Sequence, residues 1–326
     1  MSTLPTSSSG SLHTVLGSTG GVGSALVREL VQRGYRVRAV SRSGRSNDVS
    51  APIEVVAADL TSPAAVRAAT ADSAVVYYAV QPDYTRWPEE IPSMIDALLT
   101  GLADTSAKLV VVDNVYMYGP HEGSYTEALP YATTDRKGRA RAEAATRLLN
   151  ADAQGRLRVT LGRLSDYYGP GGLSKLSPAV FTSALSGQPA PWFGRLDQRH
   201  TFAYLPDVAR AFITLGERDE ANGQAWHLPA AEALTGQQFL ELVYAEAGMA
   251  YNVQLLDRAT IETLAPQMPV MREFAEILYQ NEAPFVIDAS QYQHTFGPFQ
   301  PTPHREAIRD TLAWYREHPL PESAKG

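Results

Sequence analysis

The 326-residue chain contains no cysteine. Disulfides, thiol nucleophiles and cysteine-bound metal or iron–sulfur centres are therefore excluded. The seven histidines are scattered, and none lies in a His-x-x-x-His or Glu-x-x-His spacing, so we expect no metal site. A reducing compartment fits this composition.

Long apolar runs and long Lys/Arg runs are also missing. No stretch of about 18 apolar residues occurs, so no membrane span is predicted. The net charge of −7 and the lack of a long Lys/Arg run argue against a nucleic-acid partner. The Ser/Thr-rich start of the chain resembles neither a signal peptide nor an anchor. We therefore expect a cytoplasmic protein.

Short β-rich runs alternate with longer helical runs in the first half of the chain, which predicts an α/β, doubly wound parallel sheet. Beyond residue 165, Gly/Pro-rich loops and helical stretches predict a smaller, mainly helical cap. We expect a disordered lead-in over 1–12 and a dinucleotide-binding domain over 13–165, to which about 200–230 returns. The substrate-binding cap is then 166–199 and 231–326.

A glycine loop follows the first predicted strand. Gly17, Gly20 and Gly23 form Gly-x-x-Gly-x-x-Gly between this strand and a helix. Such glycines allow a tight turn, close approach of a pyrophosphate and close helix packing. The alternative is a tight turn without a ligand. The candidate cofactor-binding residues of the loop are Gly17, Thr19, Gly20, Gly21, Val22 and Gly23.

The end of the second predicted strand lacks the acidic residue that would bind an adenosine ribose. Ser41, Arg42 and Arg45 suit a ribose 2′-phosphate instead, so NADP(H) is favoured over NAD(H). After the third strand, Asp59 and Leu60 are candidates for the adenine end, although Asp59 could equally cap a loop. Further candidate cofactor-binding residues are Ala79, after the fourth strand, and Arg139.

Several further motifs follow the glycine loop in order along the chain. They include "AADLTSP", "VVVDNVYMYGP", "RARAEAATRLL", "LGRLSDYYGPGG" and "RHTFAYLPDVARAF". Together they resemble the extended short-chain dehydrogenase/reductases, also called the NAD-dependent epimerase/dehydratase family. This resemblance implies a nicotinamide cofactor across the sheet, a cap that closes over a small-molecule substrate, and a possible homodimer.

The family's usual catalytic residues are a Ser or Thr after the fifth strand and a Tyr-x-x-x-Lys on the next helix. The motif register places Asn114 at the Ser/Thr position, Asp135 at the tyrosine and Arg139 at the lysine. Asn114 can still hydrogen-bond a carbonyl, and Arg139 can bind the ribose. An ionised Asp135 is a poor proton donor, and the pair is equally consistent with a helix ion pair. Lys137 is expected off that face, in solvent.

Two phenols are alternative proton donors. Tyr116 follows Asn114, and Tyr131 lies one helical spacing before Asp135. The chain has 16 tyrosines, so each of these two could instead be a packing residue.

Substrate contacts are expected from the start of the cap and from its aromatic and methionine side chains. Sugar-nucleotide members of the family usually bind a diphosphate with an arginine where this chain has His200, which makes such a substrate less expected. Arg199, one residue away, could bind the diphosphate instead, so a sugar-nucleotide substrate stays an alternative. The candidate substrate-binding residues are Asp166, Tyr167, Trp192, Arg199, His200 and Met271. The aromatic residues and Met271 are equally compatible with a core role.

The sequence thus favours an NADP(H)-dependent oxidoreductase that reduces a small carbonyl or imine-like substrate with an atypical proton donor. One alternative is an epimerase or dehydratase that keeps NAD(P) tightly bound. A second is an NADP-binding sensor without catalysis, which the missing Tyr and Lys would explain.

Overall fold

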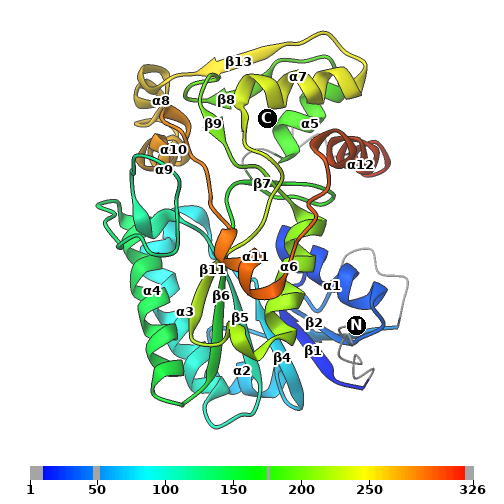
Figure 1. The fold of residues 1–326 in the computed structure, drawn as a ribbon, viewed down its shortest axis with the longest axis vertical. Helices are drawn as coiled ribbons and strands as arrows, with labels where there is room; N and C mark the ends of the chain where they lie inside the picture. The colour runs from blue at the N-terminus through cyan, green and yellow to red at the C-terminus, as the bar shows by residue number, and fades with distance from the viewer. Residues whose placement is uncertain (1–9, 47–51, 175–176, 320–326) are drawn as a thin grey trace.

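The computed structural model describes residues 10–46, 52–174 and 177–319. Its largest element is a seven-stranded parallel sheet with the order β11-β6-β5-β4-β1-β2-β3 (Figure 1). The order reverses at β1, which opens a crevice where such sheets bind ligands. The strands are β1 (Leu12–Leu16), β2 (Arg36–Ser41), β3 (Glu54–Ala57), β4 (Ser73–Tyr78), β5 (Lys108–Asp113), β6 (Arg158–Arg163) and β11 (Gln224–His227).

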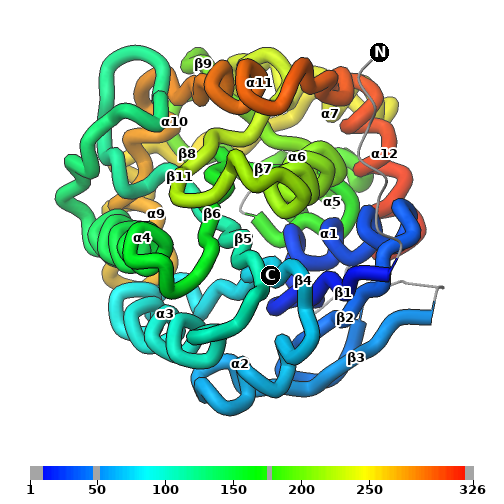
Figure 2. Tube along the Cα trace, turned by 60° about the horizontal axis from the view of Figure 1, so that its bottom comes forward, coloured from blue at the N-terminus to red at the C-terminus, as the bar shows by residue number. Residues whose placement is uncertain are grey.

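Helices cover both faces of this sheet (Figure 2). One face packs against α1 (Gly21–Gln32) and α6 (Leu205–Glu217). The other packs against α2 (Pro63–Ala69), α3 (Trp87–Leu102) and α4 (Arg136–Ala153). The predicted doubly wound α/β fold is confirmed.

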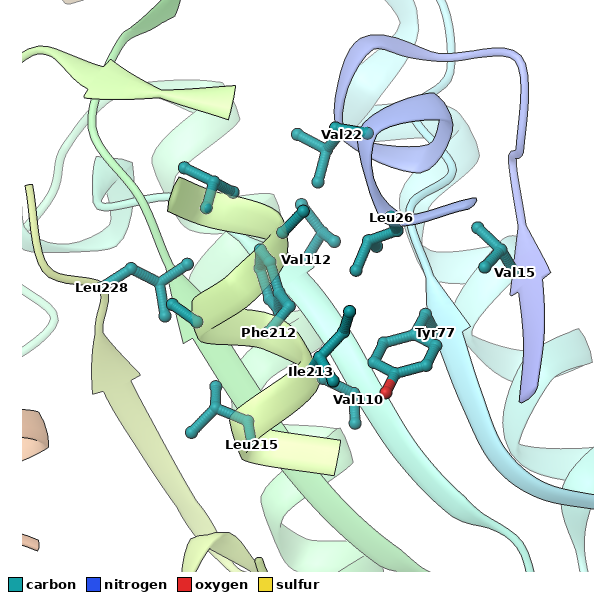
Figure 3. Packing of buried hydrophobic residues seen from close by; sticks show 14 of the residues in the cluster. Val15, Val22, Leu26, Tyr77, Val110, Val112, Phe212, Ile213, Leu215 and Leu228 are labelled. Carbon is teal, nitrogen blue, oxygen red and sulfur yellow. The ribbon is translucent and has the colours of Figure 1, made fainter. Parts of the chain in front are cut away.

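Strand β5 shows why the central sheet strands are mainly apolar. Because successive side chains point to opposite faces, Val110 and Val112 pack toward α1 and α6, and Leu109 and Val111 pack toward α2–α4. Every residue of β5 is buried, as expected of a parallel strand covered on both faces. Figure 3 shows Val112 beside the α6 side chain Phe212 and Val110 beside Ile213.

Close packing of α6 on the sheet depends on one glycine. A Cβ atom at Gly162 of β6 would collide with the Phe212 ring. The absence of a side chain therefore lets the ring lie against the strand (Figure 3).

Most of the remaining chain forms the upper part of Figure 1. Aromatic and aliphatic side chains of α5, α7 and α12 make its core. Pro266 lies in the gap between α8 and α9, and Pro269 begins α9, so the two helices stay separate. Its elements are α5 (Ser177–Leu185), β8 (Ala190–Phe193), α7 (Gly236–Ala247), β13 (Val253–Leu256), α8 (Arg258–Leu264), α9 (Pro269–Ile277), α10 (Tyr279–Glu282) and α12 (His304–Glu317). In contrast, α11 (Ser290–Phe296) packs on the sheet side, where Tyr292 joins the core beside α6 and β11.

Short elements connect these parts. The paired two-residue strands are β7 (Tyr167–Tyr168) with β10 (Ala203–Tyr204), and β9 (Arg199–His200) with β12 (Leu234–Thr235). The 3-10 turns are η1 (Tyr84–Arg86), η2 (Tyr116–Tyr118) and η3 (Asp219–Ala221). The domain boundary at residue 165 stays a prediction. Within the described residues, no helix is long and apolar enough to cross a membrane.

A buried histidine on β1 makes stability depend on pH. The ring centroid of His13 lies 4.2 Å from that of Tyr35, and its Nδ1 lies 3.3 Å from the Tyr77 hydroxyl. Burial lowers the pKa of His13 to about 4 from 6.5. The ring is therefore neutral in the fold at pH 5, whereas the unfolded chain binds a proton there.

We expect His13 to cost the fold about 2 kcal/mol of stability between pH 7 and pH 5. Stability falls as the pH falls, since only the unfolded state takes up the proton in this window. The variant His13→Val removes this contribution, so its free energy of unfolding declines less over the same interval. Urea unfolding of both proteins at pH 7 and pH 5 measures the difference. An identical decline in the two proteins would contradict the expectation.

Candidate functional site

A cleft of about 970 Å³ lies at the carboxyl ends of the sheet strands and beneath the cap. Residues that follow β1, β2, β3, β4, β5 and β6 line it, and cap residues complete it. This is the place where open α/β sheets bind their ligands. The lining includes Gly17, Thr19, Gly20, Gly21, Val22, Ser41, Arg42, Asp59, Leu60, Ala79, Gln81, Tyr84, Trp87, Asp113, Asn114, Tyr116, Asp166, Tyr167, Val270, Phe274, Gln280 and Phe285.

The glycine loop has the geometry of a phosphate cradle. Gly17 has φ +86°, and a Cβ there would lie 2.7 Å from the Ala79 carbonyl oxygen. A Cβ at Gly23 would collide with the Gly17 carbonyl oxygen, so only glycine fits. Gly20 is the N-cap of α1 and has no side chain to occupy the first-turn N–H groups. The loop therefore fits a dinucleotide pyrophosphate, with α1 pointing its N-terminus at the anion.

The structure brings most of the candidate cofactor residues to the cleft. Of the loop candidates, Gly23 lies outside the lining because it packs against Gly17. Arg42 is exposed and lines the cleft after β2. Arg45 is not part of the lining, and its backbone N–H and carbonyl hydrogen-bond the Ser41 hydroxyl. Asp59 accepts hydrogen bonds from Thr61, consistent with its alternative capping role.

Asn114 has a defined orientation in the cleft. Its Oδ1 accepts a hydrogen bond of 3.1 Å from the Tyr116 backbone N–H. Because an N–H can only meet an acceptor, the amide oxygen is fixed there and the Nδ2 group is left to donate elsewhere. Asn114 is thus arranged as a hydrogen-bond donor toward a ligand oxygen.

Three aromatic side chains form one wall beside Asn114. The Tyr116 ring stacks on Trp87 at 5.7 Å between centroids, and Tyr84 meets Trp87 edge-on at 5.1 Å. Burial, followed by the Asp166 carboxylate, raises the pKa of Tyr116. Burial, followed by Tyr116, raises the pKa of Tyr84 well above 10. Both phenols are therefore protonated at neutral pH and can donate hydrogen bonds.

Sequence reasoning missed Tyr84 and Trp87. Both follow the carboxyl end of β4 in "QPDYTRW", a position that points to the ligand side of a parallel sheet. Gln280 and Phe285 were also missed, and no local signal marks them, because only the folded cap brings them to the cleft.

Asp135 and Arg139, predicted as a candidate catalytic residue and a ribose ligand, lie outside the cleft. Asp135 is the N-cap of α4 and accepts hydrogen bonds from Thr133 and from the Gly138 backbone N–H. Arg139 is exposed, and neither residue lines the cleft. The helix begins after Asp135, so the expected i,i+4 pair on one helical face is not formed.

Lys137 and Arg141 instead occupy the side of α4 that faces the cleft wall, two residues beyond the expected register. The Lys137 ammonium lies 4.8 Å from the Tyr84 ring centroid, and the Arg141 guanidinium 4.4 Å from that of Trp87. Arg141 also donates to Gln81 and lies 3.8 Å from an Asp113 oxygen. The expectation that Lys137 is solvated was wrong, since its exposed fraction is 0%.

Lys137 belongs to an ion cluster that joins α4 to α9, which we call the clasp. It comprises Arg136 and Lys137 on α4 and Glu273 and Glu276 on α9. Lys137 contacts Glu273 directly and lies 3.2 Å from Glu276, while Arg136 contacts the same two carboxylates at 3.1 and 2.9 Å. Since α9 also supplies Val270 and Phe274 to the cleft, the clasp positions the cap over the ligand side.

The predicted substrate residues divide into two groups. Asp166 and Tyr167 line the cleft. Trp192 lies in the cap core, Met271 packs among α8–α10, Arg199 is exposed, and His200 lies behind the wall, with Nε2 3.2 Å from an Asp166 oxygen. These four are absent from the lining.

Tyr131 also lies outside the lining. Its hydroxyl accepts a hydrogen bond from Arg163, whose Nε lies 3.1 Å from Asp113. It supports the wall from behind. Within the described part of the chain, no group of three or more His, Asp or Glu side chains could hold a metal ion.

A model of the NAD-dependent epimerase/dehydratase family matches residues 13–228. The chain belongs to this family. The prediction of an NAD(P)-dependent enzyme of the epimerase/dehydratase type is thereby confirmed at that level. A dTDP-glucose 4,6-dehydratase from Neisseria gonorrhoeae is 24% identical over an alignment of 214 residues that covers 62% of this chain. The match spans 57% of the dehydratase's own length.

Solved structures share the fold over nearly the whole chain. A dTDP-glucose 4,6-dehydratase from Bacillus anthracis in complex with NAD has a TM-score of 0.79 and 17% identity, covering 95% of this chain and 97% of that one. A UDP-glucuronic acid 4-epimerase from Bacillus cereus in complex with NAD has a TM-score of 0.76 and 14% identity, covering 94% and 99%. At these identities, the likeness is one of fold.

The clasp predicts a specific stability effect. Replacing Lys137 by Met leaves the 1% exposed Glu273 short of one partner, so we expect a loss of about 3 kcal/mol in the free energy of unfolding. The double variant Lys137→Met/Glu273→Gln should recover part of it, because the uncompensated carboxylate is gone. Urea denaturation measures each value. Arg139→Met, an exposed change on the same helix, is the control, and a Lys137→Met loss no larger than the control's would refute the clasp's role.

Proposed function

We propose that this protein is an NADP(H)-dependent reductase of a small carbonyl or imine-like substrate. The observation that carries this proposal is the donor set beside the glycine-loop cleft: the Asn114 amide, oriented by the Tyr116 backbone, and the protonated Tyr116 phenol. A cytoplasmic location and a homodimer remain predictions from sequence.

The cofactor supplies a hydride when it is bound as NADPH. The glycine loop and the N-terminus of α1 would hold its pyrophosphate, and Arg42 its 2′-phosphate. Asn114 and Tyr116 would donate hydrogen bonds to the substrate oxygen, and the Tyr116 O–H would supply the proton that completes an alcohol. The proposed proton donor thus lies after β5, and not on α4, where the family's tyrosine is expected.

The charges of the cleft support a substrate other than a nucleotide diphosphate. Among the described lining residues the cations are Arg42 and Arg86, whereas the acidic side chains are Asp59, Asp83, Glu90, Asp113 and Asp166. Arg86 is paired with Glu90 at 2.8 Å. His200 is paired with Asp166, and Arg199 bonds a backbone carbonyl at the surface. Beyond the cofactor end, the nearby cations are already paired, Arg86 with Glu90 and both Arg163 and Arg141 with Asp113, so a dianionic substrate would find little attraction there.

The relatives favour a second candidate, an epimerase or dehydratase with tightly held NAD(P). Protein purified without added cofactor distinguishes the two. An oxidised dinucleotide that copurifies and remains through dialysis favours the second candidate, whereas free exchange of NADPH favours the reductase.

The cofactor preference depends on Arg42. We expect Arg42→Ala to weaken NADPH binding about tenfold and to leave NADH binding within twofold, because only NADPH carries the 2′-phosphate. Fluorescence titration of both cofactors measures this. Arg156→Ala, an exposed change after α4, is the matched control. Tighter binding of NADH than NADPH by the unaltered protein would refute the assignment.

The donor assignment predicts a loss of turnover. With a panel of small ketones, aldehydes and imines, we expect Tyr116→Phe and Asn114→Ala each to lower kcat about 100-fold for carbonyl substrates. Preformed iminium ions need no added proton, so Tyr116→Phe should affect them far less. Tyr251→Phe, at an exposed cap position 43% accessible to solvent, is the matched control.

Two outcomes would overturn this assignment. Unchanged carbonyl rates in both variants would remove Asn114 and Tyr116 from the chemistry. If the unaltered protein binds NADPH but oxidises it with no member of the panel, the sensor alternative replaces the reductase.

A further inference from the structure

The side of α9 that faces the cleft is apolar. Val270 and Phe274 both line the cleft, and we call them the apolar pair. They lie four residues apart, so they share one side of the helix. Val270 is 36% exposed and Phe274 is half-buried, so a ligand in the cleft can reach both side chains. Apolar surface left open in a cleft suits an apolar ligand, which removes that surface from water.

The clasp fixes this orientation of α9. Its two carboxylates, Glu273 and Glu276, contact the cations of α4. Met271 packs on a different side of the helix, against Ile261 of α8. The helix therefore cannot turn about its axis without breaking the clasp and uncovering Met271. Within α9, whose residues the structure describes in full, no charged side chain lines the cleft.

A row of aromatic rings connects the apolar pair to the proposed proton donor. Phe274 lies 6.0 Å from Tyr84, measured between ring centroids. Trp87 continues the row, at 5.1 Å from Tyr84 and 5.7 Å from Tyr116. All four side chains line the same cleft. A substituent on a carbonyl that is bound at Tyr116 can therefore follow this wall to α9.

The charged side chains that follow β4 beside this wall already have partners. Arg86 lies 2.8 Å from Glu90. Asp83 accepts hydrogen bonds from the hydroxyl and the backbone N–H of Thr85. A charged substituent would have to compete with these partners, whereas an apolar one only displaces water from apolar surface.

We propose that the apolar pair binds a hydrophobic alkyl or aryl substituent on the carbonyl carbon that accepts the hydride. This rests on the proposed reductase function and narrows its substrate class to ketones, aldehydes or imines with an apolar chain or ring of several carbons. Val270 and Phe274 are specificity-determining residues and take no part in proton transfer.

Methyl ketones of increasing chain length test the proposal. From 2-butanone to 2-octanone we expect kcat/KM to rise about threefold for each added methylene, because each one is removed from water against the wall. A terminal hydroxyl in place of the last methyl group turns 2-octanone into 7-hydroxy-2-heptanone. We expect this change to lower kcat/KM about tenfold, because the hydroxyl loses its water at an apolar surface.

The variant Val270→Thr replaces one methyl group by a hydroxyl of similar size at a partly exposed position, so the fold is kept. We expect the ratio of kcat/KM between 2-octanone and 2-butanone to fall about fivefold, with the rate for 2-butanone nearly unchanged. Val270→Ile stays apolar and should retain the ratio. Val55→Thr, the same exchange at a 41% exposed valine outside the cleft lining, is the matched control.

Ligand-observed NMR with the protein and NADP⁺ gives a readout that does not need turnover. If no ketone is reduced, the proposed function fails, while tighter binding of 2-octanone than of 2-butanone, weakened by Val270→Thr, still supports the apolar pair. The inference is overturned if neither measurement shows a gain with chain length, if Val270→Thr leaves the gain unaltered, or if the hydroxy ketone is preferred.

Discussion

The buried Lys137 ammonium is the constraint on which the rest of the site depends. A fully buried cation is stable only if carboxylates come to it, and both of its carboxylates belong to α9. The cap helix must therefore lie against α4. In that position it places Phe274 next to Tyr84, with 6.0 Å between ring centroids, and closes the substrate end of the cleft. A surface lysine would leave α9 without this anchor.

The clasp also decides which residues can act on a ligand. Lys137 and Arg141 back the aromatic wall, so the cations lie behind Tyr84 and Trp87 while the rings and Asn114 face the cleft. These two cations stabilise the ring faces that they contact, and they do not contact a substrate in the cleft. This arrangement accounts for a cleft whose lining is rich in acidic and aromatic side chains.

The fold and the cofactor loop could be predicted from sequence because their signals are local. Gly17 has a positive φ, Gly23 contacts Gly17 six residues before it, and the β5 run is apolar because two helical layers cover it. The orientation of Asn114 could not be predicted, since it depends on one backbone hydrogen bond. The places of Asp135 and Arg139 could not be predicted for a similar reason: motif spacing does not say where the helix begins, and Asp135 caps it, so that Lys137 is the buried side chain of the first turn. Gln280 reaches the cleft only through cap packing.

The environment of the phenols limits what they could do in the proposed reaction. Burial raises the pKa of Tyr116 and raises that of Tyr84 well above 10, so the phenolate form of either is scarce at neutral pH. Oxidation of an alcohol, or removal of a proton from carbon, needs a base in that place. In the proposed reductase, protonated Tyr116 would donate a hydrogen bond to the substrate oxygen. Because a raised pKa also makes the phenol a weaker acid, its proton would pass to the strongly basic alkoxide oxygen of the product and not to the neutral carbonyl.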